Sequence, residues 1–249
     1  MTARTSIRQR SRWRGIAFNL AFYGWTVLLL PVGAIAGLCG PAAVRAVSRF
    51  WAQGALGLLG AIAGVRHRVV GREHLPAGPV MLAIKHQSAW ETIALNLVLR
   101  DPAFVLKQEL TRIPVFGWLL RRAGMIAVDR DGGAAALRGM VAAARARLAE
   151  GRPIVIFPEG TRVPPGERRP YHPGVAALYG ALDVPVVPVA LDSGRFWPRR
   201  DMRMAGGTIT LAFLPPIAPG LARRAFAGTL ESAIEDAVAT LDANDRDIS

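Results

Sequence analysis

Apolar residues near the N-terminus form one long stretch without charge. From Gly15 to Val44 the chain carries no charged residue, and a helix needs roughly 20 apolar residues to cross a bilayer core. Pro31 and several glycines interrupt the second half of this stretch, which suits a broken, re-entrant or interfacial hairpin as well as a straight helix. A second apolar stretch runs from Trp51 to Val65. We therefore expect residues 1–70 to form a basic arm and a membrane-embedded helical hairpin.

The flank of the first apolar stretch is strongly basic. It carries Arg4, Arg8, Arg10, Arg12 and Arg14, and such a flank predicts a cytoplasmic N-terminus. A cleaved signal peptide is the competing interpretation, but the apolar stretch is much longer than the roughly 7–15 residues of a signal core. We therefore expect the protein at the inner (cytoplasmic) membrane, with the remainder of the chain on the cytoplasmic face.

From about residue 79 onward, short apolar runs alternate with longer helical ones. This alternation is typical of βα repetition and of a largely parallel or mixed sheet covered by helices. Helices are expected from Gly133 to Glu150 and from about Leu221 to Leu241. The expected strands are Pro79–Ile84, Ala103–Leu106, Met125–Val128, Ile154–Phe157, Val184–Leu191 and Thr208–Phe213. The pattern predicts one α/β domain over residues 71–249.

Charge and cysteine content narrow the classes of protein only slightly. The formal net charge of +13 attracts polyanions such as anionic lipid, phosphorylated metabolites, acidic carrier proteins or nucleic acid. Charge alone does not choose among them. The single cysteine, Cys39, excludes an internal disulfide and a cysteine-rich metal site.

Unusual polar residues directly follow the expected strands. Ligands of open α/β sheets bind in the crevice outside the carboxyl ends of the strands. One crevice can therefore hold a base, a carboxylate and several cations. The polar segments, in strand order, are Lys85-His86, Lys107, Asp129-Arg130 and Pro158-Glu159-Gly160-Thr161-Arg162.

His86 is the candidate base of this crevice. The unperturbed pKa of a histidine, roughly 6.5, lets it accept and return a proton near neutrality. Glu91, five positions on, can hold the imidazole in the tautomer that leaves the other nitrogen free. Ser88-Ala89-Trp90-Glu91 also fits a capping box, in which Glu91 bonds back to the amide of the cap. The two roles compete for one carboxylate, and spacing alone favours the cap.

Arg130 and Arg162 are candidate phosphate ligands. Guanidinium groups bind phosphate in a bidentate fork and stay charged, although arginines more often form surface ion pairs. The chain has no Gly-x-Ser-x-Gly elbow, no P-loop, no dinucleotide fingerprint and no zinc-ligand spacing. These absences disfavour covalent serine catalysis, nucleotide hydrolysis and a metal mechanism, so we expect no metal site.

At these residues the chain resembles the 1-acyl-glycerol-3-phosphate acyltransferases, the lysophosphatidic acid acyltransferases of the glycerolipid acyltransferase superfamily. The resemblance covers about Pro79 to Gly194. It rests on four motifs in the family's order. They are His86 to Glu91, where the family has a histidine followed after four residues by an aspartate; Lys107-Gln108-Glu109-Leu110, Pro114, Gly117-Trp118, Gly124 and Asp129-Arg130; the intact motif Phe157 to Arg162; and Val184-Pro185-Val186-Val187-Pro188-Val189.

The resemblance implies that an acyl chain passes directly from a thioester to the sn-2 hydroxyl of 1-acyl-glycerol-3-phosphate, giving phosphatidic acid in phospholipid biosynthesis. It implies His86 as general base, Glu91 as its orienting acid and no acyl-enzyme. No cofactor is expected; acyl-CoA or acyl carrier protein is the co-substrate, the membrane is a partner, and nucleic acid is not. The implied substrate-binding residues are Lys107, Arg130, Glu159, Gly160, Thr161 and Arg162.

Two departures from the family pattern leave alternatives open. Glu91 is one methylene longer than the family's aspartate. Tyr171-His172-Pro173-Gly174 stands where the family usually has Phe-Lys-x-Gly, so a cation is lost beside the implied acceptor. A lyso-ornithine lipid or another lysophospholipid is therefore an alternative acceptor. An alternative of another class is a noncatalytic basic protein that binds membrane or nucleic acid, and its function would survive the loss of His86.

Overall fold

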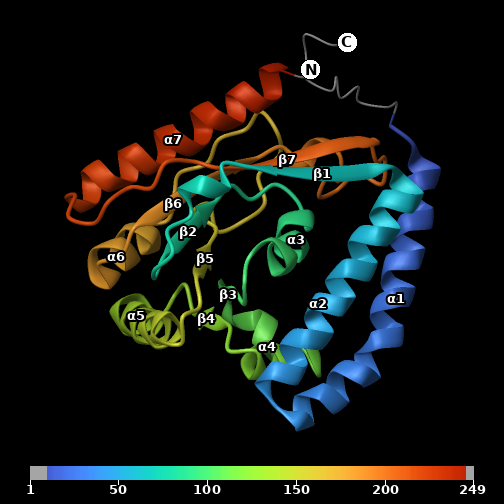
Figure 1. Ribbon diagram of the computed structural model, residues 1–249, viewed down its shortest axis with the longest axis horizontal. Coiled ribbons are helices and arrows are strands. Elements are labelled where there is room, and N and C mark those ends of the chain that lie inside the picture. Colours follow the sequence, from blue (N-terminus) through green and yellow to red (C-terminus); the bar gives the residue numbers. More distant parts are fainter. Residues whose placement is uncertain (1–9, 245–249) are drawn as a thin grey trace.

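The computed structural model describes residues 10–244 and shows a mixed sheet of 7 strands between layers of helices (Figure 1). The order of the strands is β1-β7-β6-β2-β5-β3-β4. All neighbours are parallel except β6 and β7, which are antiparallel. The strands are β1 (Val65–Val70), β2 (Met81–Ile84), β3 (Ala103–Lys107), β4 (Ile126–Val128), β5 (Ile154–Ile156), β6 (Val186–Leu191) and β7 (Gly207–Phe213). The predicted α/β class is confirmed.

The helices fall into two groups in Figure 1. On one side lie α1 (Arg12–Cys39), α2 (Pro41–Leu58), α3 (Trp90–Val98) and α4 (Phe116–Arg122); on the other lie α5 (Gly133–Ala149), α6 (Pro173–Leu182) and α7 (Arg223–Asn244). Short helical turns occupy Leu59–Ala63, Arg72–His74, Gln108–Arg112 and Ser193–Arg195. The two helices expected in the second half of the chain are present as α5 and α7.

The sheet is buried on both faces because successive side chains of a strand point to opposite sides. In β2, Leu82 and Ile84 join the apolar cluster that contains Trp90 of α3. Met81 and Ala83 join the opposite cluster, which contains Leu178 of α6. Burying a large apolar side chain contributes roughly 1.5–3 kcal/mol. This two-sided burial explains why the central strands read as continuous apolar runs.

One strand of the sheet was not expected from the sequence. β1 pairs in parallel with β7, from Val65 opposite Gly207 to Val70 opposite Ala212. It lies at the edge of the sheet, and Arg66 and Arg68 are exposed, so charge obscures its strand pattern. Charged side chains are common on edge strands because they discourage pairing with other chains. The division of the chain at residue 70 stays a prediction, although β1 on its N-terminal side belongs to the sheet.

The N-terminal segment forms two helices, and the second begins before the apolar stretch from Trp51 to Val65. α1 continues through Pro31, and α2 begins at Pro41 after the turn at Gly40, whose φ is +119°. α1 is long and apolar enough to cross a membrane, judged by length and composition. Its large side chains are strongly exposed, for example Leu20 at 71% and Leu38 at 79%. Such a surface is typical of a helix in contact with lipid. Arg4 and Arg8 of the predicted basic arm lie outside the described residues.

Candidate active site

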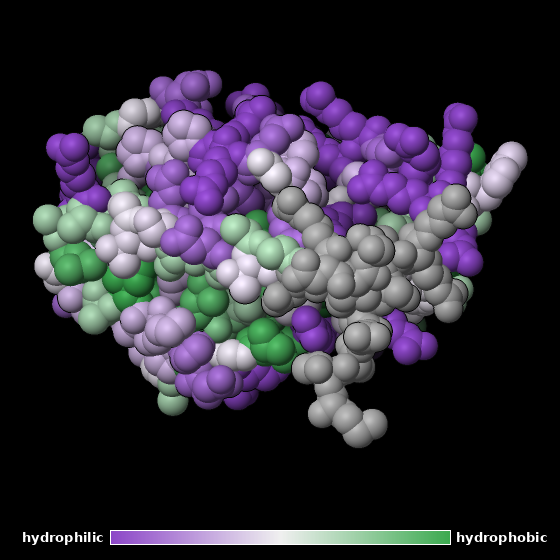
Figure 2. All heavy atoms as spheres, turned by 90° about the horizontal axis from the view of Figure 1, so that it is seen from above, coloured by the Kyte–Doolittle hydropathy of each residue, from purple (hydrophilic) through white to green (hydrophobic). Residues whose placement is uncertain are grey.

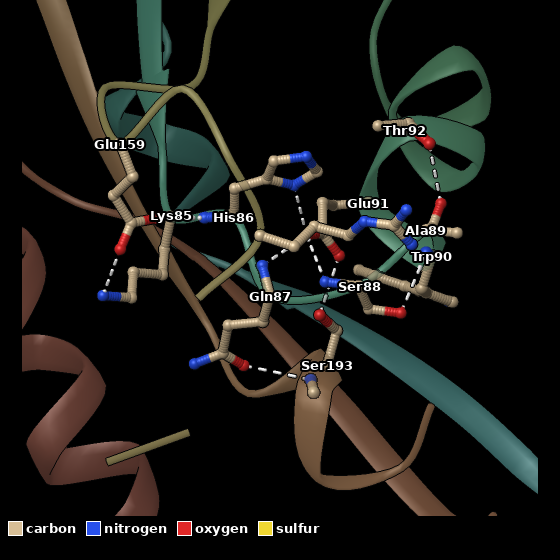
Figure 3. A network of polar contacts seen from close by, with 12 residues as sticks. Lys85, His86, Gln87, Ser88, Ala89, Trp90, Glu91, Thr92, Glu159 and Ser193 are labelled. Carbon is tan, nitrogen blue, oxygen red and sulfur yellow. Dashed lines mark hydrogen bonds and ion pairs between the residues drawn. The ribbon is translucent and has the colours of Figure 1, made fainter. Parts of the chain in front are cut away.

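His86 lies two residues beyond the end of β2, near the middle of the sheet. Its Nδ1 is 2.8 Å from Glu91 Oε1 (Figure 3). Its ring stacks on Phe157, with centroids 4.1 Å apart and an angle of 22° between the planes. The side chain is 15% exposed and lines a large cavity. The hydrogen bond and the stack fix the imidazole, so that Nε2 is left free to exchange a proton.

Glu91 performs both of the roles that the sequence left in competition. Its Oε1 accepts hydrogen bonds from the backbone N–H groups of Gln87 and Ser88, each at 2.7 Å. The bond from Ser88 is the one that the carboxylate of a capping box makes, although α3 itself begins at Trp90, after Ala89. The same oxygen lies against the imidazole of His86. The carboxylate is fully buried. The cap therefore holds the acid in place for the histidine, and the two interpretations are compatible.

The end of β6 also holds this acid. Ser193 Oγ donates to Glu91 Oε2 at 2.7 Å, and the N–H of Gly194 donates to Gln87 Oε1 at 3.0 Å. Ser193 was not among the residues that we predicted from the sequence. A signal was present, because Ser193 follows a predicted strand just as His86 does.

Glu159, which we predicted as a substrate-binding residue, is instead buried beneath the site. Its Oε1 lies 2.6 Å from Lys85 Nζ, and its Oε2 accepts the backbone N–H of His86 at 2.9 Å. Lys85 is 1% exposed and lies 2.8 Å from Glu235 Oε1 of α7, which also accepts from the hydroxyl of Tyr171 at 3.0 Å. Burial raises the pKa of Glu159, and Lys85 opposes that rise. Its carboxylate is therefore occupied by the protein itself.

The cavity beside His86 has a volume of about 1290 Å³. Apolar side chains of α1, α2 and α4 line one end, among them Leu29, Leu30 and Leu119. The predicted residues Lys107, Arg130, Gly160, Thr161 and Arg162 also line it. The structure thus brings the predicted base and the predicted cations to one cavity and leaves out Glu159. Among the residues described, no group of His, Cys, Asp and Glu side chains could hold a metal ion.

The cations of the cavity differ in whether other groups of the protein already bind them. Lys107 is half exposed and pairs with Glu109 at 2.8 Å. Arg130 donates to the carbonyl oxygen of Gly160 at 2.6 Å. Burial lowers the pKa of Arg162, and the positive charge of the neighbouring Arg199 lowers it further. Within residues 10–244, neither Arg162 nor Arg199 forms an ion pair with a carboxylate. The negative charge of Glu91 partly opposes the lowering of the Arg162 pKa, but two adjacent cations that form no ion pair with a carboxylate still favour the binding of an anion.

Arg199 is a cavity residue that the sequence analysis missed. Its Nη1 lies 3.2 Å from Thr161 Oγ1 and 3.3 Å from the carbonyl oxygen of Arg162. It comes from the loop between β6 and β7 rather than from the residues just after a strand. The rule that located the other cations therefore could not locate it.

Gly160 is required by the close approach of its neighbours. Its φ is +63°, in the left-handed region that favours glycine. A Cβ at this position would lie 2.7–2.8 Å from the ring of His172. Gly160 therefore lets the loop from Pro158 to Arg162 turn against the segment that carries His172.

Comparisons with known proteins agree with this geometry. A family model described as Acyltransferase matches residues 66–192. The 1-acyl-sn-glycerol-3-phosphate acyltransferase of Pseudomonas aeruginosa is 36% identical over 184 residues, covering 74% of this chain and 72% of that protein. The human 1-acyl-sn-glycerol-3-phosphate acyltransferase alpha is 29% identical over 209 residues, covering 80% and 71%.

A solved structure shares the fold over nearly the whole chain. The crystal structure of the 1-acyl-sn-glycerophosphate (LPA) acyltransferase PlsC from Thermotoga maritima matches with a TM-score of 0.75 at 21% identity, covering 94% of this chain and 98% of that one. The family model spans the segment from His86 to Arg162. The chain belongs to the family of the 1-acyl-sn-glycerol-3-phosphate acyltransferases.

Proposed function

We propose that the protein transfers an acyl chain from a thioester to the sn-2 hydroxyl of 1-acyl-glycerol-3-phosphate and so makes phosphatidic acid. The observation that carries the proposal is the imidazole of His86, fixed by Glu91, on the same cavity as Arg162 and Arg199. A base beside two cations suits an acceptor that bears both a hydroxyl and a phosphate. The names of the relatives in Pseudomonas aeruginosa and human support the same acceptor.

The geometry supports general-base catalysis by His86. Nε2 takes the proton of the acceptor hydroxyl as its oxygen attacks the thioester carbonyl. Glu91 stabilises the imidazolium that forms. The tetrahedral intermediate collapses, the carbon–sulfur bond breaks, and the imidazolium returns its proton to the departing thiolate. The products are an ester and a free thiol, and no acyl-enzyme forms.

The charged and apolar ends of the cavity support binding of a lysophospholipid. Arg162 and Arg199 are close enough for the charge of Arg199 to lower the pKa of Arg162, so a phosphate between them would relieve that repulsion. Arg199 also supplies a positive charge in the cavity, where His172 replaces the family's lysine. The apolar end lies against α1 and α2, where an acyl chain can enter from lipid. The basic Arg12 and Arg14 at the start of α1 support a place at the inner membrane, with the catalytic domain on the cytoplasmic face.

Release of free thiol tests the proposed reaction. In detergent, with an acyl thioester and lysophosphatidate, the wild-type protein should release thiol, and His86→Ala should lower the rate by about 10²–10⁴-fold. His74→Ala is the matched control, because His74 contacts the carbonyl oxygen of Phe213 outside the cavity. Equal rates for the wild-type protein and His86→Ala would reject the proposal.

His172 keeps a second acceptor open. It lines the cavity where the family usually has a lysine, and this loss of charge favours an acceptor with less negative charge, such as a lyso-ornithine lipid. A panel of lysolipids tested with one acyl donor decides between lysophosphatidate and lyso-ornithine lipid as the acceptor. A higher kcat/KM for lyso-ornithine lipid than for lysophosphatidate would favour the second acceptor.

A further inference from the structure

The cavity extends beyond His86, away from α1 and α2. Its far end is lined by Leu137 of α5, Ala177 of α6 and Arg223 and Arg224 of α7. A smaller hollow of about 350 Å³ adjoins it and shares Leu137, Ala177 and Arg223. The hollow adds Arg138 and Arg145 of α5. The two spaces together lead from the catalytic histidine to the seam between α5, α6 and α7.

The cations at this seam lack counterions. Arg138, Arg223 and Arg224 are exposed, and in the described part of the chain none of them forms an ion pair with a carboxylate. Arg145 differs, because it donates to the carbonyl oxygen of Ala181 at 2.7 Å, near the end of α6. The seam therefore combines apolar lining residues with arginines that form no ion pair with a carboxylate of the described chain.

The seam lies on the opposite side of the molecule from the exposed apolar helices. Figure 1 shows α5, α6 and α7 on one side and α1 and α2 on the other. Seen from above, the face that carries α7 mixes hydrophilic side chains with apolar ones (Figure 2). Arg138, Arg223 and Arg224 are exposed at the seam, whereas the apolar end of the cavity lies at α1 and α2, whose large apolar side chains are exposed. This placement disfavours a lipid headgroup as the occupant of the seam.

We propose that the seam binds the phosphate end of the pantetheine arm that carries the acyl chain of the donor. The inference rests on the proposed function, which places the thioester carbonyl at His86. An acyl chain that enters the apolar end directs the arm on the other side of the sulfur toward α5, α6 and α7. The arm ends in phosphate in both acyl-CoA and acyl carrier protein, and arginines suit phosphate. The acceptor phosphate keeps a separate place between Arg162 and Arg199.

Donor kinetics test the inference. Arg223→Gln/Arg224→Gln should raise the KM for acyl-CoA about tenfold, as expected for two partly exposed ion pairs to phosphate. The KM for lysophosphatidate and kcat should change little. The control Arg66→Gln/Arg100→Gln removes the same charge from exposed residues outside both spaces. The donor KM of the wild-type protein should also rise more steeply with salt than that of the seam variant.

Direct binding of CoA separates this inference from the reaction itself. Titration calorimetry with CoA should show weaker binding to Arg223→Gln/Arg224→Gln than to the wild-type protein. The single variant Arg138→Gln should also bind CoA more weakly, and it serves as the test if the double variant fails to fold. An increase in KM for acyl-CoA and for acyl carrier protein assigns the phosphate that is attached to pantetheine in both donors. An increase for acyl-CoA alone assigns the nucleotide phosphates.

The results that overturn the inference differ from those that overturn the reaction. If the wild-type protein transfers acyl groups but both seam variants keep its donor KM and its affinity for CoA, the inference is wrong and the reaction stands. If the seam variants lose binding to anionic vesicles while their donor KM is unchanged, the seam belongs to a lipid headgroup. If the wild-type protein transfers no acyl group, both are wrong.

Discussion

At the scale of single residues, Glu91 has more contacts than a simple partner of His86 would need. Its oxygens accept from two backbone N–H groups, from Ser193 and from the imidazole. Because these donors come from the loop after β2 and from the turn after β6, they fix the carboxylate from two directions. The additional methylene of Glu91, relative to the family's aspartate, is therefore compatible with a fixed imidazole.

Replacing Glu91 tests this positioning. Glu91→Gln should lower kcat by about 10²-fold or more, because an amide cannot stabilise the imidazolium as a carboxylate does. Ser193→Ala removes a single hydrogen bond, worth about 1 kcal/mol, and should lower kcat much less. Steady-state thiol release measures both effects. A Glu91→Gln variant with the kcat of the wild-type protein would show that the dyad has no catalytic role.

The buried Lys85 supports His86 through Glu159. Lys85→Met removes the buried cation between Glu159 and Glu235 and leaves Glu235, within the described chain, only the exposed Arg168 at 3.9 Å as a cation. Breaking a buried ion pair costs about 3–5 kcal/mol of unfolding free energy. Lys107→Met breaks a half-exposed pair and should cost at most about 1 kcal/mol. Urea unfolding measures both. Similar losses for the two variants would contradict the buried network.

The loss in Lys85→Met should also depend on pH. Burial raises the pKa of Glu159, and removal of Lys85 removes the charge that opposes this rise. The folded variant then binds a proton more tightly than the unfolded chain does, so its free energy of unfolding rises as the pH falls through the pKa of the folded state. The difference in stability between the wild-type protein and the variant should therefore narrow in acid. A constant difference would mean that Glu159 does not titrate in this way.

Several residues of the site could be found from the sequence, and others could not. His86, Arg130 and Arg162 follow strands, so the rule for the carboxyl ends of a sheet locates them. Ser193 obeys the same rule and was overlooked. Glu235 lies on α7, 150 positions from Lys85, and an acid in an amphipathic helix gives no sign of a buried partner. Contacts across such sequence distances depend on the folded packing rather than on a local pattern.

At the scale of elements, strand recognition depended on burial. The six expected strands were found because both their faces are apolar or nearly so, whereas β1 presents Arg66 and Arg68 at the edge of the sheet. Glycines in α1 and α2 made a broken hairpin as reasonable as a straight helix, yet α1 continues through Pro31. The local pattern therefore predicted most elements. It could not predict the edge strand or the geometry of the helices, because these depend on tertiary contacts.

The loop from Pro158 to Arg162 gives an element-scale test. Gly160→Ala should cost roughly 1–2 kcal/mol from its positive φ and should also displace His172, which raises the KM for lysophosphatidate. Gly166→Ala is the matched control, because Gly166 has a φ of +82° and nothing within 4 Å of its added Cβ. Thermal unfolding and steady-state kinetics separate the two effects. If Gly166→Ala raised the acceptor KM as much as Gly160→Ala, the contact with His172 would not matter.

At the scale of the whole molecule, one cavity joins an apolar end at α1 and α2 to a cationic end at α7. α1 presents exposed apolar side chains, and α7 presents the exposed Arg223 and Arg224. His86 lies between them on the same cavity. Under the proposed function, this arrangement lets a lipid acceptor and a water-soluble donor meet at one imidazole.

Membrane association should depend on the exposed face of α1. Leu28→Glu/Leu38→Glu should lower partitioning onto phospholipid vesicles at least tenfold, since an apolar side chain removed from water is worth roughly 1.5–3 kcal/mol. Val70→Glu, at an exposed position of β1, is the control and should partition as the wild-type protein does. Vesicle flotation measures the effect. Unchanged flotation of the α1 variant would contradict the assignment of this face to lipid.

The central claim is that a base and two phosphate-binding cations lie on one cavity. The most direct test compares kcat/KM for lysophosphatidate with kcat/KM for uncharged monoacylglycerol. Arg162→Gln and Arg199→Gln should each lower kcat/KM for lysophosphatidate by about 10- to 100-fold, as expected for a lost charge-assisted hydrogen bond, and leave that for monoacylglycerol nearly unchanged. Arg200→Gln, an exposed neighbour outside the cavity, should alter neither. Equal losses for both acceptors in the two cavity variants would contradict the claim.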